Sequence, residues 1–217
     1  MNKNITIVVP HGDDELLGFG GVIQKHIQNK DNVDVIFARK AIDERTAKQI
    51  SNIFDAKKIL KYRESINLGF SEIDLSHNPL NFFRKLESTL FTLNPDIVYT
   101  TFWGDIHQDH KIVFDWVSRA VRVHGPLNVK QFYVGEIPSS TDQNPYIIGD
   151  VFKPNFYIKL SEQEAKLKAE SILCYKNEVQ KYPHPRSVDG ILNLSKIRGQ
   201  ECGTYFAEAF MCLRYIE

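Results

Sequence analysis

Short β-branched runs alternate with longer stretches of helical periodicity in the first part of the chain. Residues 5–9 read Ile-Thr-Ile-Val-Val and end at Pro10, and residues 33–38, Val-Asp-Val-Ile-Phe-Ala, are expected to form a second strand. A strand that is buried on both faces of a parallel sheet has this continuous apolar composition. Residues 14–27 lie between the two runs and are typical of a crossover helix, which parallel strands require. This alternation predicts a doubly wound α/β sheet.

The same alternation continues along the chain, although the second half is harder to interpret. Further strands are expected at residues 65–70, 96–103, 129–137 and 155–160. Further helices are expected at residues 44–60, 79–91, 112–120 and 162–177, and a closing strand or short helix at residues 206–216. The expected fold is therefore a Rossmann-like, doubly wound, mainly parallel sheet with helices on both faces. Because no linker composition separates the halves, residues 1–217 are interpreted as a single domain.

Charge and hydropathy argue against several functional classes. The chain has 27 Lys and Arg residues and 27 Asp and Glu residues, so a broad basic surface for nucleic acid is not expected. No apolar run approaches the ~18 residues that a transmembrane helix needs. The apolar run near the N-terminus is too short for a secretory signal. These features predict a cytoplasmic protein with no transmembrane segment, for which a homo-oligomer is possible.

Two clusters of histidines and carboxylates follow two of the expected strands. Residues 11–15 read His-Gly-Asp-Asp-Glu, and residues 105–110 read Asp-Ile-His-Gln-Asp-His. In an open α/β sheet, ligands bind in the crevice beyond the C-terminal ends of the strands. Imidazole nitrogens and carboxylate oxygens are zinc ligands, and a catalytic zinc site uses three of them. We therefore expect the two loops to converge on one metal site.

Within the clusters, the residue types suggest different roles. His11 and Asp14 are three residues apart, as are His107 and His110, so each pair can face one side of a helical turn. Because Asp13 and Asp14 cannot point the same way, one can bind the metal while the other serves as a base. Either His107 or His110 can complete the ligand set, and the spacing does not decide between them.

Each cluster taken alone also has an ordinary structural explanation. Aspartates at the start of a helix are favoured caps and complement the helix dipole. The combination of histidines and carboxylates after two strands of one sheet favours a metal site instead. Glycines at positions 18, 20 and 21 lie inside the expected helix, so we interpret them as small residues for close packing against the sheet.

The two clusters resemble the motifs of the PIG-L/LmbE-like family of zinc-dependent deacetylases, which remove N-acetyl groups from glucosamine-containing substrates. Residues 10–15 resemble the family's Ala-His-Pro-Asp-Asp-Glu motif with changes at Pro10 and Gly12, and residues 107–110 match its His-x-Asp-His motif. Arg45 resembles an arginine that opens the helix after the second strand, although a lysine follows where the family often has glutamate. A bacterial branch of the family is similar at residues 175–178, 184–187, 198–199 and 207–210.

The resemblance implies which residues hold the metal and carry the chemistry. The implied ligands of Zn²⁺, with another divalent metal possible, are His11, Asp14 and His110. Asp13 is the implied general base, which accepts a proton from a metal-activated water as that water attacks an amide carbonyl. His107 and Asp109 are an implied supporting pair, in which the carboxylate could orient the imidazole. Arg45, or a protonated His107, would stabilise the oxyanion, and Glu15 is expected to support the helix N-terminus.

The loop at residues 182–187 is predicted to line the substrate side of the pocket. Pro183 and Pro185 fix its backbone and would present His184 and Arg186 rigidly. His184 could donate to the acetyl oxygen, and Arg186 could pair with an anionic group on the substrate. The alternative is a stiff connecting loop whose charged side chains are solvated.

The functional hypothesis is hydrolysis of the N-acetyl group of an amino sugar, a small molecule that is free or carried on a glycoside, nucleotide or lipid. An amidase that acts on another amide of a sugar conjugate is the nearest alternative. A metal-dependent phosphoesterase is less favoured, because two-metal sites generally need more carboxylates than this ligand set provides. A non-catalytic protein that retains the metal site is the remaining alternative.

Overall fold

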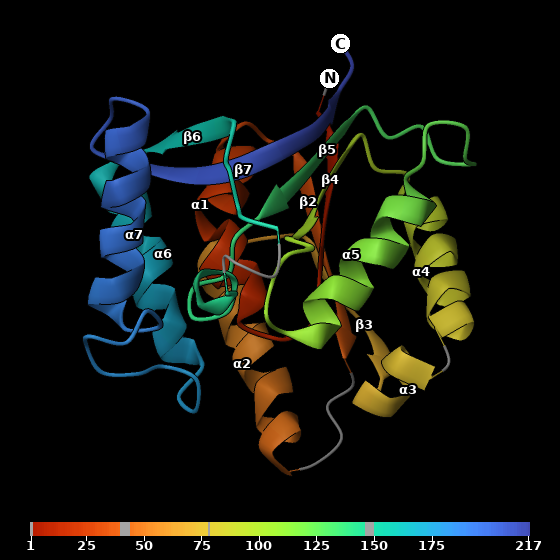
Figure 1. The fold of residues 1–217 in the computed structure, drawn as a ribbon, viewed down its shortest axis with the longest axis horizontal. Helices are drawn as coiled ribbons and strands as arrows, with labels where there is room; N and C mark the ends of the chain where they lie inside the picture. Colours follow the sequence, from red (N-terminus) through yellow and green to blue (C-terminus); the bar gives the residue numbers. More distant parts are fainter. Residues whose placement is uncertain (1, 40–43, 78, 146–149) are drawn as a thin grey trace.

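The computed structural model describes residues 2–39, 44–77, 79–145 and 150–217. Its strands are β1 (Asn4–Val9), β2 (Asn32–Arg39), β3 (Glu64–Phe70), β4 (Ile97–Thr101), β5 (Gln131–Gly135), β6 (Phe156–Leu160) and β7 (Phe206–Tyr215). They form one sheet in the order β3-β2-β1-β4-β5-β7-β6 (Figure 1). Strands β1 to β5 are parallel to one another, whereas β7 is antiparallel to both β5 and β6.

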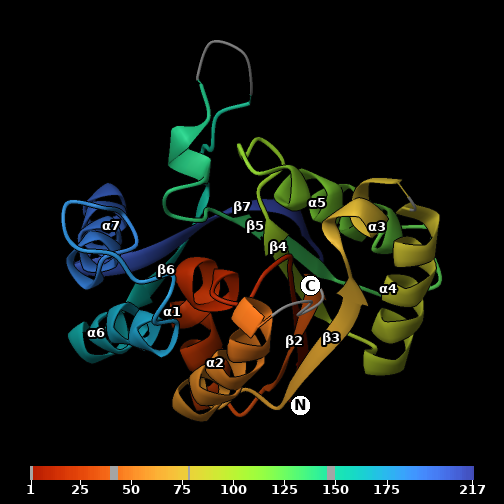
Figure 2. The ribbon, with the colours of Figure 1, turned by 90° about the horizontal axis from the view of Figure 1, so that it is seen from below.

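Helices cover both faces of this sheet (Figures 1 and 2). The described helices are α1 (Asp14–Gln28), α2 (Glu44–Leu60), α3 (Glu72–His77), α4 (Pro79–Leu93), α5 (Gln108–Ala120), α6 (Glu162–Ser171) and α7 (Val188–Glu201). α1, α2, α6 and α7 lie on one face, and α3, α4 and α5 lie on the other. Across the ranges that the structure describes, no helix is both long and apolar enough to cross a lipid bilayer.

Each face of the sheet has its own apolar core. Ile7 and Val8 are neighbours in β1, and their side chains point to opposite faces because side-chain direction alternates along a strand. Ile7 belongs to the same core as Phe19 of α1, whereas Val8 belongs to the core that contains Leu86 of α4 and Val113 of α5. The expected doubly wound, mainly parallel α/β fold is thus confirmed.

The structure departs from the sequence-based prediction mainly in the second half of the chain. α7 is not indicated by the sequence, because its buried positions include Ser195 and Gly199 beside Ile191 and the apolar periodicity is therefore weak. The helix expected at residues 162–177 ends at Ser171 and continues as a 3₁₀ turn, Ile172–Cys174. The chain closes with a strand, β7, and α3 is too short for its periodicity to be recognised.

The strand order reverses beside β1. β1 pairs in parallel with β2 on one side and with β4 on the other. β3 lies beyond β2, and β5 lies beyond β4. Loops that leave the C-terminal ends of β1 and β4 therefore run in opposite directions and leave a crevice between them. Residues 10–13 and 102–107 form these two loops.

Glycines allow α1 to pack closely against its neighbours. A Cβ atom added at Gly18 would lie 2.7 Å from Cδ1 of Ile137, and one added at Gly21 would lie 2.7 Å from Cδ1 of Leu160. Side-chain atoms in a close-packed interior cannot approach to that distance without a shift. These glycines therefore serve close packing, as their place inside the helix predicts.

A buried ion pair joins α1 to α6 and β7. Glu208 of β7 accepts hydrogen bonds from the backbone N–H groups of Gly21 and Val22, each at 2.6 Å. The Nζ atom of Lys168, on α6, lies 2.7 Å from Oε1 of the same carboxylate. Both charged side chains are buried, and buried charges are costly unless they are paired and hydrogen-bonded. The C-terminal strand is thereby fixed to the helix that follows the first polar cluster.

We predict that Lys168→Met lowers the free energy of unfolding by about 3–5 kcal/mol, because it leaves Glu208 as an uncompensated buried charge. Lys166→Met is the matched control on the same helix, since the pair between Lys166 and Glu162 is exposed and should contribute little. Urea denaturation of both variants measures the difference. Equal losses in the two variants would contradict the importance of the buried pair.

Candidate metal centre

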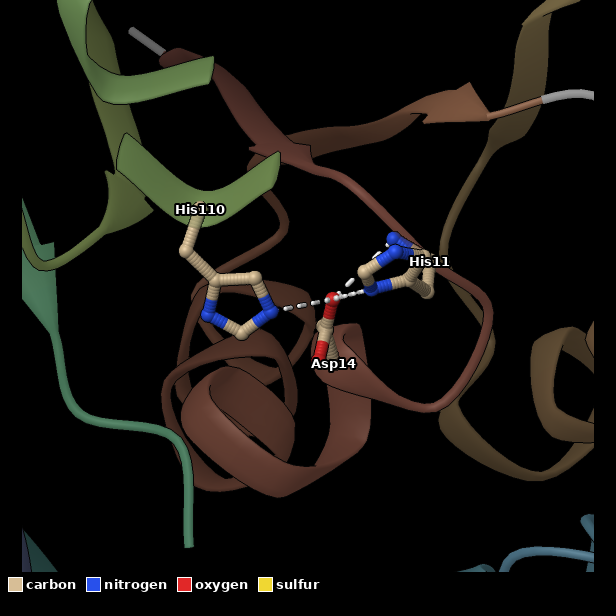
Figure 3. A group of neighbouring side chains, drawn as sticks. All are labelled: His11, Asp14 and His110. Carbon is tan, nitrogen blue, oxygen red and sulfur yellow. Dashed lines mark hydrogen bonds and ion pairs between the residues drawn. The ribbon is translucent and has the colours of Figure 1, made fainter. Parts of the chain in front are cut away.

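The two polar clusters meet at the crevice between β1 and β4. His11 lies in the loop after β1, Asp14 is the first residue of α1, and His110 lies in the first turn of α5. Figure 3 shows the three side chains pointing toward one another. Oδ2 of Asp14 lies 3.2 Å from Nδ1 of His11 and 3.5 Å from Nε2 of His110. One ligand atom from each residue falls within 4.8 Å of the other two.

The Asp14 carboxylate fits a bound cation. Its Oδ2 atom accepts a hydrogen bond of 3.0 Å from the backbone N–H of His11. Its Oδ1 atom is buried and has no hydrogen-bond partner in the structure. A buried carboxylate oxygen without a partner is costly, and two imidazoles with one carboxylate are a donor set typical of catalytic zinc. These three residues could therefore hold a divalent metal ion.

His110 is fixed in orientation by a network behind it. Its Nδ1 atom lies 3.0 Å from Oδ2 of Asp105. That carboxylate also accepts hydrogen bonds from the hydroxyls of Ser140 and Thr141 and from the backbone N–H of His107. A carboxylate that accepts from one ring nitrogen leaves the other nitrogen available to a metal, and here that nitrogen, Nε2, faces Asp14.

The Asp109 carboxylate is hydrogen-bonded to residues other than the His107 ring. His107 is exposed and caps the N-terminus of α5, where its Nδ1 atom accepts a 3.3 Å hydrogen bond from the backbone N–H of Asp109. The Asp109 carboxylate turns instead to Nε2 of His11, at 2.9 Å, and to Nη1 of Arg39, at 2.5 Å. Asp109 therefore orients His11, whereas the expected pair had it orient His107.

The charges of the cluster are strongly coupled. Burial lowers the pKa of His11, but hydrogen bonds to Asp109 and Asp14 outweigh it and raise that pKa to about 9. Burial also lowers the pKa of His110, but the neighbouring carboxylates of Asp14 and Asp105 outweigh it and raise that pKa to about 10. Without an ion both imidazoles hold their protons at neutral pH, so a metal ion must displace protons when it binds.

Asp13 occupies a strained position between the loop and α1. Its φ angle is 102°, a left-handed conformation that costs about 1–3 kcal/mol in a non-glycine residue. Its side chain does not cap α1 but accepts a 3.0 Å hydrogen bond from Nη1 of Arg186. Burial and the charge of Asp14 raise the pKa of Asp13 well above its usual value, and Arg186 opposes the shift. Asp13 is therefore a buried carboxyl group suited to take up a proton.

Glu15 holds the strained turn at Asp13 through hydrogen bonds. Its Oε2 atom accepts a 2.9 Å hydrogen bond from the backbone N–H of Asp13, and its Oε1 atom accepts one of 2.6 Å from the Tyr175 hydroxyl. Burial raises the pKa of Glu15 to about 7, against the effect of the Tyr175 hydrogen bond. Glu15 thus links the turn to the C-terminal half of the chain.

We predict that Tyr175→Phe lowers the free energy of unfolding by about 1–3 kcal/mol, because the buried Glu15 carboxyl group loses its hydroxyl donor. Tyr205→Phe is the control, since Tyr205 is 90% exposed and its change should be within about 0.5 kcal/mol of zero. Chemical denaturation measures both values. A Tyr175→Phe protein as stable as the control would show that Glu15 does not need this donor.

The other predicted site residues are divided between the cluster and its surroundings. Arg186 reaches the cluster through Asp13 and donates from Nε to Oγ of Ser139, at 2.6 Å. His184 is exposed, and its Nδ1 atom accepts a 3.1 Å hydrogen bond from the backbone N–H of Arg186. Arg45 lies in the first turn of α2, and its side chain is outside the part of the chain that the structure describes.

The sequence assigns no role to three residues that contact the cluster, although Tyr175 lies in the segment 175–178 that is similar to the family. Asp105 was assigned no role, although its place in the second cluster was a usable signal. Arg39 ends β2 at the same edge of the sheet, and that position alone could have suggested it. Tyr175 lies 160 residues from Glu15, and no local pattern connects the two.

Comparison with models of protein families identifies the family of this chain. The model of the PIG-L family, described as GlcNAc-PI de-N-acetylase, matches residues 6–121. This span is more than half of the chain and contains His11, Asp14 and His110. The chain belongs to the PIG-L family, as the resemblance of its motifs predicts.

Solved structures share the fold at low sequence identity. The conserved protein TT1542 from Thermus thermophilus is 21% identical with a TM-score of 0.80, and the match covers 99% of this chain and 96% of that one. An N,N'-diacetylchitobiose deacetylase from Pyrococcus horikoshii is 16% identical with a TM-score of 0.77, covering 98% and 84%. GalB, a 4-carboxy-2-hydroxymuconate hydratase from Pseudomonas putida, is 14% identical with a TM-score of 0.75, covering 100% and 99%. The fold is therefore shared by proteins with different reactions.

Proposed function

We propose that the protein is a metal-dependent hydrolase that removes the N-acetyl group from an N-acetylated amino sugar. The observation that carries the proposal is the buried Asp14 carboxylate, which lies between two imidazoles and beside a second buried carboxyl group, Asp13. Membership of the PIG-L family and the fold shared with a diacetylchitobiose deacetylase support the same reaction class. The substrate is a small molecule, either free or carried on a glycoside, nucleotide or lipid.

His11, Asp14 and His110 are proposed to hold the metal. Two nitrogen donors and one carboxylate suit Zn²⁺, and another divalent ion could also bind them. A metal in this position polarises the acetyl carbonyl group and lowers the pKa of water. The His110 assignment is favoured over His107 because His110 is buried and backed by Asp105, as metal-binding histidines usually are.

Asp13 is proposed to be the general base. It accepts a proton from the attacking water and returns one to the nitrogen as the amide C–N bond breaks, so that acetate and a free amine are formed. Arg186 holds this carboxyl group in place through Nη1 and is itself held by Ser139. The Arg186 side chain is 20% exposed and is also proposed to contact the substrate, with His184 near it on the loop.

His107 and Arg45 are proposed to act on the carbonyl oxygen. Partial burial and the charges of the neighbouring imidazoles lower the pKa of His107, which favours the neutral ring. Because its Nδ1 atom accepts from the backbone N–H of Asp109, its proton lies on Nε2, which can donate to a developing oxyanion. Arg45 remains the candidate cation for the same oxyanion.

The whole chain is proposed to act as one domain. The proposed ligands lie in the loop after β1 and in the first turns of α1 and α5, whereas Ser139, Tyr175 and Arg186 come from the second half of the chain. Since both halves contribute strands to the same sheet, the site would not survive their separation.

The direct test is metal analysis of the purified protein together with an acetate-release assay on a panel of N-acetylated sugars and conjugates. One zinc ion per chain and release of acetate would support the proposal. Release of a different acid from an amide would favour the amidase alternative. Phosphate release from model esters without acetate release would contradict the proposal.

We predict that Asp13→Asn keeps the metal but lowers kcat by about 10²–10⁴-fold, because the amide has nearly the same shape but cannot accept the proton. Asparagine also tolerates the left-handed backbone of this position. Acetate release and metal content are measured on the same preparation. Activity within a few-fold of the parent protein would exclude Asp13 as the base.

We also predict that His110→Ala loses the metal, whereas His107→Ala keeps it and loses turnover. The physical reason is that Nε2 of His110 faces Asp14, while His107 lies exposed at the helix start. Competition with a chromogenic chelator measures metal affinity in both variants. The reverse result would make His107 the third ligand.

A further inference from the structure

His11 belongs to two overlapping groups of metal-ligating side chains. The first is the His11–Asp14–His110 group, and the second is the His11–His107–Asp109 group, whose ligand atoms also lie within 4.8 Å of one another. The two groups use opposite sides of the His11 ring. Nδ1 lies 3.2 Å from Oδ2 of Asp14, and Nε2 lies 2.9 Å from Oδ2 of Asp109. Since a neutral imidazole offers one lone pair, His11 can serve only one group at a time.

Arg39 is placed to decide between these groups. Its Nη1 atom lies 2.5 Å from Oδ2 of Asp109, the same oxygen that faces His11. Its backbone N–H donates to the carbonyl oxygen of Pro10 at 2.9 Å, which fixes the end of β2 next to the loop that carries His11. A guanidinium therefore stands beside the only carboxylate of the second group.

We infer that Arg39 is a positioning residue that selects the first group by occupying the cation position of the second; this inference rests on the proposed metal centre. A divalent ion on Asp109 would lie close to the Arg39 charge and be repelled by it. With Asp109 paired to Arg39, the carboxylate accepts the Nε2–H of His11 and leaves the Nδ1 lone pair for the first group.

A second arginine is paired with a neighbouring carboxylate in the same way. Asp13 lies beside Arg186, and Asp109 lies beside Arg39. Glu15 and Asp105 are held instead by the Tyr175 hydroxyl and the His110 ring. Among the described residues no arginine is paired with Asp14, and its buried Oδ1 atom has no hydrogen-bond partner. Of the three carboxylates Asp13, Asp14 and Asp109, Asp14 is thus the one left for an external cation.

The test uses the full chain, stripped of metal with a chelator and titrated with Zn²⁺ alone. Arg39→Met removes the charge and the donors at similar length. Zinc affinity is measured for His110→Ala and His107→Ala, each in the parent and in the Arg39→Met background. Far-UV circular dichroism checks folding, and Arg39→Gln replaces Arg39→Met if the latter does not fold.

In the parent background we expect His110→Ala to weaken zinc binding by at least about 100-fold and His107→Ala by less than about 3-fold. In the Arg39→Met background the ion can move to Asp109 and His107. The His110→Ala loss is then expected to shrink by about 10-fold, and the His107→Ala loss to grow by a similar factor, the scale on which residues behind a metal ligand act.

Two further variants test whether the effect comes from the positive charge of Arg39 or from a general disturbance of the structure. Arg63→Met removes another arginine–carboxylate pair of β2, whose Nη2 to Asp34 Oδ2 distance is also 2.5 Å, and should leave the pattern of the parent. Arg39→Lys retains a cation and should also resemble the parent. A change caused by Arg63→Met or a lysine variant that behaves like Arg39→Met would overturn the inference.

Unchanged dependence on His110 in the Arg39→Met background would overturn the inference while leaving the proposed function intact. A parent protein that binds zinc and depends on His107 from the start would also overturn it. A parent protein that binds no zinc would overturn both this inference and the proposed metal centre.

Discussion

The burial of several carboxyl groups at one edge of the sheet is the constraint on which the site depends. Asp13, Asp14, Glu15, Asp105 and Asp109 are each at most 3% exposed. Buried charges persist only where cations or hydrogen-bond donors compensate them. Arginines, a histidine and a tyrosine compensate four of the five. The fifth, Asp14, is compensated in part by two imidazoles, and its remaining oxygen has no hydrogen-bond partner among the described residues.

The fold brings this arrangement about through strand order and through the second half of the chain. The β1–β4 pairing places the two ligand-bearing loops side by side. The family match ends at residue 121, yet Thr141, Tyr175 and Arg186 lie beyond it and hold Asp105, Glu15 and Asp13. The C-terminal half therefore supplies the support without which the N-terminal motif would be a strained, uncompensated turn.

The reaction is a property of these side chains and not of the fold. A deacetylase and a hydratase both match this chain over nearly its whole length. Both reactions use water, so the polarity of the crevice alone would not separate them. The proposed amide hydrolysis rests instead on the pair of neighbouring buried carboxyl groups, Asp13 and Asp14, because a departing amine must be given a proton.

The sequence by itself determined the alternation of strands and helices, the two polar clusters and the family, because each is encoded in a short, local pattern. It did not reveal α7, whose buried face carries Ser195 and Gly199, since packing against β7 replaces the usual apolar stripe. Only the tertiary structure decided which charged side chains pair with each other. Asp109 pairs with Arg39 and His11, although His107 is its neighbour in the motif. The physical reason is that periodicity specifies the face of an element, whereas a pairing of charges depends on which distant segments the sheet brings together.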